Sequence, residues 1–155
     1  MTIFELSVGL ASAVVGSLGF ALIFRLRPRY LVPAGIGGLL AYAVYLLFAE
    51  LGWHIFATNF IASCASALYS ELFARKMKAP TLLFSIPCII PLVPGSLLYY
   101  AMSFLLKGNY ASALSYFTDT VLTAVGIAGG MIAVSIVFTL YMHASKSFRE
   151  KKSKN

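Results

Sequence analysis

Five long apolar stretches constrain this chain more than any other feature of its sequence. An apolar stretch of roughly 20 residues is long enough to cross the hydrocarbon core of a bilayer as a helix. With 60% hydrophobic and only 11% charged residues, the chain leaves no room for a soluble catalytic domain. We therefore expect an all-α integral membrane protein, a bundle of about five transmembrane helices. The stretches are residues 3–24, 30–48, 55–72, 81–106 and 120–142.

The basic residues fall on alternate connections, which predicts a topology. All of them except Lys107 follow the first, third or fifth stretch. Under the positive-inside rule these segments are cytoplasmic, so we expect the N-terminus outside and the C-terminus inside. Residues 1–144 then form the transmembrane domain, and residues 145–155 form a basic cytoplasmic tail that lies against anionic lipid. The net charge of +7 thus reflects topology, and no nucleic acid partner is expected.

The first stretch resembles a signal peptide in hydrophobicity, but no basic segment precedes it and its positive charges follow it. We expect it to be retained as an anchor.

Small residues recur at every fourth position, as they do where membrane helices pack closely. Contact among the five helices of one chain is the favoured interpretation, and an interface between chains is the alternative. The residues are Gly9, Ala13, Ser17 and Ala21; Ala62, Ser66, Ser70 and Ala74; and Gly126 with Gly130.

The residues able to carry chemistry are few. Cys64 and Cys88 lack metal-ligand spacing and are interpreted as packing residues, so neither a metal nor a cofactor is expected. No nucleophile stands beside a base at matched depth, which argues against an enzyme. Glu71 and Arg75, four residues apart, are predicted to form an ion pair, with proton coupling as the alternative. Asp119 is expected to cap the fifth helix.

The fourth stretch contains prolines within an apolar segment. Pro87, Pro91 and Pro94 each lack an N–H, so a continuous helix would leave carbonyl groups without partners. Irregular backbone at membrane depth is tolerated only where protein or a watery cavity surrounds it. Pro94 and Gly95 lie at the middle of the stretch, and we expect a half-helix starting at Gly95 or Ser96 to offer free N–H groups to a carboxylate. The alternative is a kinked helix or hairpin that only packs.

The segments SELFARKMKAP and IPCIIPLVPGSLLYYAM resemble the threonine/serine exporter family, specifically its small five-span half. The recurring core of that family is Pro-x-x-Pro-Gly followed four residues later by Tyr. It falls here on Pro91, Pro94, Gly95 and Tyr99. Weaker matches are Ser70, Glu71, Ala74, Arg75, Pro80, Pro87, Ala101 and Met102.

The resemblance implies a multi-pass exporter of the bacterial cytoplasmic (inner) membrane. Its substrates would be threonine and serine, or a dicarboxylate such as succinate. The resemblance also implies a larger five-span partner subunit, and a homo-oligomer is a further option. No P-loop is present, so we expect gradient-driven alternating access. The expected substrate-binding residues are Pro91, Pro94, Gly95, Ser96 and Tyr99, with Glu71 and Arg75 for coupling. The competing hypothesis is a channel-like or scaffolding subunit without a substrate site.

Overall fold

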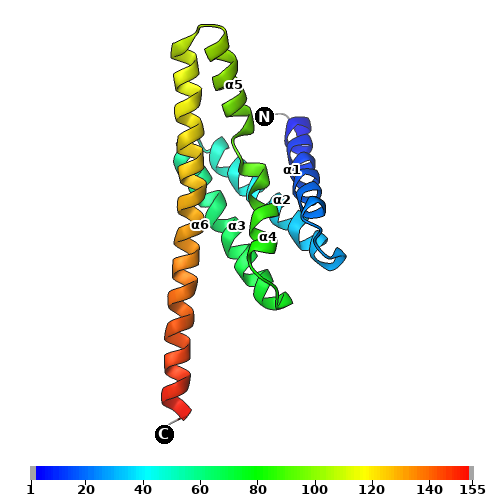
Figure 1. Cartoon of the computed structure of the whole chain (residues 1–155), viewed down its shortest axis with the longest axis vertical. Coiled ribbons are helices and arrows are strands. Elements are labelled where there is room, and N and C mark those ends of the chain that lie inside the picture. The colour runs from blue at the N-terminus through cyan, green and yellow to red at the C-terminus, as the bar shows by residue number, and fades with distance from the viewer. Residues whose placement is uncertain (1–2, 154–155) are drawn as a thin grey trace.

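The computed structural model describes the backbone of residues 3–153 and the side chains of residues 4–143. All the secondary structure in this part of the chain is helical, which confirms the all-α expectation (Figure 1). The elements are α1 (Ile3–Ile23), α2 (Pro28–Glu50), α3 (Ile55–Met77), α4 (Leu82–Ile89), the 3-10 helix η1 (Ile90–Leu92), α5 (Gly95–Leu106) and α6 (Tyr110–Ser153).

Three of the described helices are long and apolar enough to cross a membrane: α1, α2 and the Tyr110–His143 part of α6. The segment Leu82–Leu92 and helix α5 pass the same test together, as one bent pair, which raises the number to four. Helix α3 is not among them, so this criterion yields three or four spans where the sequence predicted about five.

The composition of α3 follows from its place in the fold. It contacts α2, α4 and α6, so much of its surface faces other helices (Figure 1). The contact faces of α3 carry small and polar side chains. Its buried polar residues are Thr58, Asn59, Ser63, Ser66 and Ser70. A helix that its neighbours shield can have a low hydropathy without exposing polar groups to lipid.

The glycine pair of α6 brings this helix close to α3. A Cβ at Gly126 would lie 2.8 Å from the carbonyl oxygen of Phe56, and one at Gly130 would collide with Ser63. Such close approach is what small residues four apart permit. The predicted packing role of Gly126 and Gly130 is confirmed, and the contact lies within one chain.

The stripe of small residues on α1 packs in the same way. Ser17 and Ala21 are fully buried, and a Cβ at Gly38 of α2 would collide with Ser17. A Cβ at Gly9 would lie 2.9 Å from the ring of Tyr42, also on α2. This stripe therefore joins α1 to α2.

The start of the last helix differs from the expectation. Helix α6 begins at Tyr110 and not at residue 120, so Asp119 lies inside the helix and the prediction that it caps the helix is wrong. Asn109 caps it instead, because its Oδ1 accepts a hydrogen bond from the N–H of Ser112 at 3.2 Å. Polar residues between 107 and 119 suggested a loop, but packing of α5 on α6 favours helix there. The α6 backbone continues into the basic tail as far as Ser153, and Lys154 lies outside the described residues.

Candidate solute-binding cavity

The helix of the fourth stretch is interrupted near Pro91 and Pro94, whereas Pro87 lies inside α4. Helix α4 ends at Ile89, η1 follows, and α5 starts at Gly95 after a bend of 46°. Pro94 is the N-cap residue of α5, with ψ at 51°, outside the helical region. In a continuous helix the carbonyl of Ile90 would have no partner, because Pro94 lacks an N–H; here it accepts the N–H of Val93 at 3.2 Å. The 3-10 turn therefore satisfies part of the backbone that the prolines disrupt.

The start of α5 differs in detail from the predicted carboxylate site. The N–H of Gly95 donates to the carbonyl oxygen of Val93 at 2.8 Å, so the expectation that it is free is wrong. Pro94 lies at the centre of a tight turn, and this turn brings the two groups together. No side chain caps α5, and Ser96 lies within the helix. A Cβ at Gly95 would meet open space, so no contact within the chain demands glycine there.

A cavity of about 340 Å³ lies beside the break. Five elements line it: α2, α3, η1, α5 and α6. None of its lining residues, all within the described part of the chain, is charged. They are Tyr42, Tyr45, Ile55, Asn59, Pro91, Leu92, Val93, Pro94, Ser96, Leu97 and Thr123.

The structure brings together only some of the expected substrate-binding residues. Pro91, Pro94 and Ser96 line the cavity, whereas Gly95 and Tyr99 are not among its lining residues. The Tyr99 side chain is 68% exposed and makes an edge contact with the ring of Tyr100. The site residues predicted from the family motif thus divide between the cavity and the outer face of α5.

Two polar residues of the cavity were not predicted from the sequence. Asn59 on α3 is 1% exposed and Thr123 on α6 is 3% exposed. The Nδ2 of Asn59 donates to the carbonyl oxygen of Ile55 at 2.8 Å. The Oδ1 of Asn59 and the Oγ1 of Thr123 have no hydrogen-bond partner among the described residues. An uncharged amide inside an apolar stretch was the available signal, because burying one without a partner is costly.

A second hollow, of about 460 Å³, shares the lining residues Tyr42 and Pro91 with this cavity. Ser12 and Gly16 of α1 also line it. Pro91 therefore borders two hollows, as expected for irregular backbone beside a cavity.

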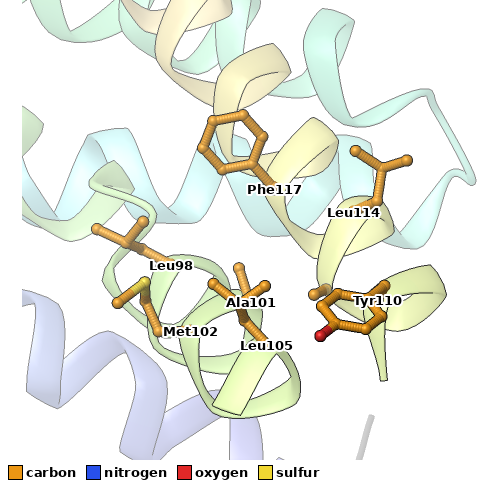
Figure 2. A pocket seen from close by; sticks show the side chains of 8 residues that line it. Leu98, Ala101, Met102, Leu105, Tyr110, Leu114 and Phe117 are labelled. Carbon is orange, nitrogen blue, oxygen red and sulfur yellow. The ribbon is translucent and has the colours of Figure 1, made fainter. Parts of the chain in front are cut away.

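A third hollow, of about 440 Å³, is a groove lined by α5 and the first turns of α6. Figure 2 shows Leu98, Met102 and Leu105 of α5 facing Leu114 and Phe117 of α6. The lining is apolar, so this groove suits a hydrocarbon chain or an apolar helix and not a polar solute. Ala101 and Met102, two residues of the family resemblance, belong to it.

The predicted ion pair is present near the C-terminal end of α3. The guanidinium of Arg75 lies 3.3 Å from the carboxylate of Glu71. Arg75 also lies over the ring of Phe138 at 4.8 Å and contacts the sulfur of Met142, both on α6. These contacts give Arg75 a packing role between α3 and α6.

The two cysteines are both free. Cys88 is fully buried, with its Sγ 3.9 Å from the carbonyl oxygen of Ala34, as expected of a packing residue. Cys64 is partly buried, and its Sγ lies 3.5 Å from the carbonyl oxygen of Gly130. Among the described residues, no group of three or more His, Cys, Asp and Glu side chains could hold a metal ion.

Comparison with known proteins finds one matching family model and a relative of similar sequence. A family model described as "Threonine/Serine exporter, ThrE" matches residues 9–137. An uncharacterized protein of Haemophilus influenzae is 24% identical over 153 residues, which cover 97% of this chain and 51% of that protein. The chain therefore spans about half the length of this curated relative. No solved structure matches the chain.

Proposed function

The chain belongs to the threonine/serine exporter family, and we propose that it is a membrane subunit that exports a small solute, a hydroxy amino acid or a dicarboxylate such as succinate. The family match over residues 9–137 carries this proposal. The broken helix beside a polar cavity supports it, because transporters place solutes against discontinuous helices.

We propose that α3 is the remaining span of a five-span domain. Its buried polar side chains are compatible with a helix that other helices shield from lipid. With five spans, the distribution of basic residues orients the N-terminus outward and the C-terminus toward the cytoplasm. The proposed location is the bacterial cytoplasmic membrane.

A second, larger membrane subunit is proposed to complete the transport pathway. Two observations support this. The curated relative is about twice as long as this chain, so it has room for a second half. Within the described residues, α5 packs mainly on α6, and Leu106 and Tyr99 are largely exposed. A homo-oligomer would cover these side chains as well, and co-purification of the two candidate subunits separates the two assemblies.

The proposed mechanism is alternating access driven by an ion or proton gradient. The bend between α4 and α5 provides a hinge at which one half of the span can move relative to the other. Glu71 and Arg75 are the candidates for coupling. If they couple transport to protons, Glu71→Gln will abolish the gradient dependence of efflux; if they only form an ion pair, it will persist.

The alternative function is a channel-like or scaffolding subunit with no substrate site. The test is efflux of labelled threonine, serine and succinate from cells that carry this chain with and without the larger subunit. We expect faster efflux of at least one solute with the pair present. Faster efflux that is unchanged by substitutions at Pro94 and Ser96 supports the scaffold. No acceleration of any of the three solutes contradicts the proposed function.

A further inference from the structure

We propose that Asn59 and Thr123 bind a hydrogen-bond-donating group of the transported solute in the cavity beside the helix break. This inference rests on the proposed function, because it takes the occupant of the cavity to be the exported solute. The chemical class is a small, net-neutral amino acid, which carries an ammonium group together with a carboxylate.

Asn59 defines the kind of group that the cavity can bind. Its Nδ2 is already committed to the carbonyl oxygen of Ile55 at 2.8 Å, which fixes the orientation of the amide. The unpartnered Oδ1 can only accept a hydrogen bond. The side chain is 1% exposed and lines the cavity, so the cavity is the side from which a donor group of the solute can reach it.

Thr123 provides a second polar group from a different helix. The helices α3 and α6 lie close together at Gly126, where an added Cβ would be 3.4 Å from the Cβ of Asn59. Thr123 lies almost one helical turn before Gly126 on α6. Its unpartnered hydroxyl can donate or accept, so it can bind either an ammonium or a hydroxyl group.

The remaining lining favours a net-neutral solute. Ser96 and Leu97, in the first turn of α5, line the same cavity. The N-terminal end of a helix carries partial positive charge, which suits a carboxylate. An acceptor at Asn59 and a positive helix end at Ser96 complement the two charges of an amino acid. A dicarboxylate dianion offers no donor to Asn59 and meets no cationic side chain among the lining residues.

The structure provides a matched control for the test. Thr123→Val and Asn59→Leu remove the two unpartnered groups and keep the number of side-chain heavy atoms. Thr123→Val is the cleaner variant, because Asn59→Leu also removes the hydrogen bond to Ile55. Ser66 is also fully buried on α3 with an unpartnered Oγ, but it is not among the residues that line the cavity. Ser66→Ala therefore removes a buried hydroxyl without changing the proposed site. Deleting an unpartnered buried hydroxyl should not lower stability, so Thr123→Val should fold.

The measurement is the melting temperature of the purified full chain in detergent with increasing threonine or succinate. We expect threonine to stabilise the wild type and Ser66→Ala. Thr123→Val and Asn59→Leu should need roughly tenfold more threonine for the same shift, the effect of losing one hydrogen bond to a charged group. Succinate should give no shift. The inference is overturned if threonine fails to stabilise the wild type, if all four proteins respond equally, or if succinate acts like threonine.

Efflux from cells that carry the chain and the larger subunit separates this inference from the proposed function. Threonine binding without export leaves the cavity assignment intact and contradicts the exporter. Export that Thr123→Val leaves unchanged contradicts the cavity assignment and leaves the exporter intact.

Discussion

Where Gly130 of α6 meets Ser63 of α3, the two helices approach so closely that a single methyl group has no space. A Cβ at Gly130 would lie 2.5 Å from the carbonyl oxygen of Phe60 and 3.1 Å from the N–H nitrogen of Cys64. Backbone atoms cannot move aside as a flexible side chain can. The helix pair must separate to admit the extra carbon.

We predict that Gly130→Ala lowers the free energy of unfolding by about 1–3 kcal/mol, the usual cost of overpacking. Thermal unfolding in detergent measures this. Gly19→Ala on α1 is the control, because a Cβ there meets nothing within 4 Å, and its melting temperature should be unchanged or raised. Equal stability of Gly130→Ala and wild type would show that α3 and α6 are not packed as described.

The single residues also show what the sequence could and could not predict. The spacing of Gly126 and Gly130 and the pair Glu71–Arg75 predicted contacts that the structure contains. Both depend on helical periodicity, which is a local property. Asn59 and Thr123 lie on helices far apart in the sequence, so only the folded chain reveals that they share a cavity.

At the scale of the helical elements, the fourth stretch bends where Pro91 and Pro94 lie between α4 and α5. Pro94 has no N–H and its ψ of 51° directs the chain away from a straight helix. The sequence predicted an interruption near Pro94 and Gly95, since missing N–H groups are visible in the sequence. It did not predict the 3-10 turn at Ile90–Leu92, which contacts α1 and α2, two helices distant in the sequence.

We predict that the double variant Pro91→Ala with Pro94→Ala straightens this segment. Two spin labels at Leu82 and Leu106 report the change, because removing a bend of 46° lengthens the distance between them. The variant should retain its helical content and lose efflux. An unchanged distance would mean that packing against α1, α2 and α6 causes the bend, and not the prolines. Pro33→Ala in α2, outside the break, is the control and should leave the distance unchanged.

The helix boundaries differ most where polar residues suggested loops. Helix α6 starts at Tyr110 because α5 covers one face of its first turns, where Phe104 stacks on Tyr116 with ring centroids 5.5 Å apart. Such contacts between elements favour helix at Tyr110, before the apolar stretch 120–142 begins.

For the whole molecule, the central prediction from sequence is the topology of five spans. Apolar length and the alternation of basic residues predict it, but three or four described helices meet the test for a span, and α3 does not. We propose that α3 is a span nevertheless, because a helix that packs against α2, α4 and α6 does not need the hydropathy of a lipid-facing one.

Impermeant thiol labelling tests this topology in intact cells, after Cys64→Ala and Cys88→Ala remove the native thiols. We predict that a cysteine replacing Lys107, in the connection after α5, is labelled from outside. A cysteine replacing Lys78, in the connection after α3, should be labelled only after the membrane is permeabilised. Labelling of both positions from the same side would exclude an odd number of spans between them.

The central claim is that the exported solute binds beside the broken helix. Its most direct test is whether the solute protects a cysteine at the break from a thiol reagent. In the same cysteine-free background, a small thiol reagent labels a cysteine that replaces Leu97, a lining residue of the cavity. The control is a cysteine that replaces Tyr110, which is 71% exposed in the α5–α6 groove. We predict that threonine slows labelling at position 97 and leaves position 110 unaffected. Equal labelling rates at position 97 with and without threonine would contradict the claim that the exported solute binds beside the broken helix.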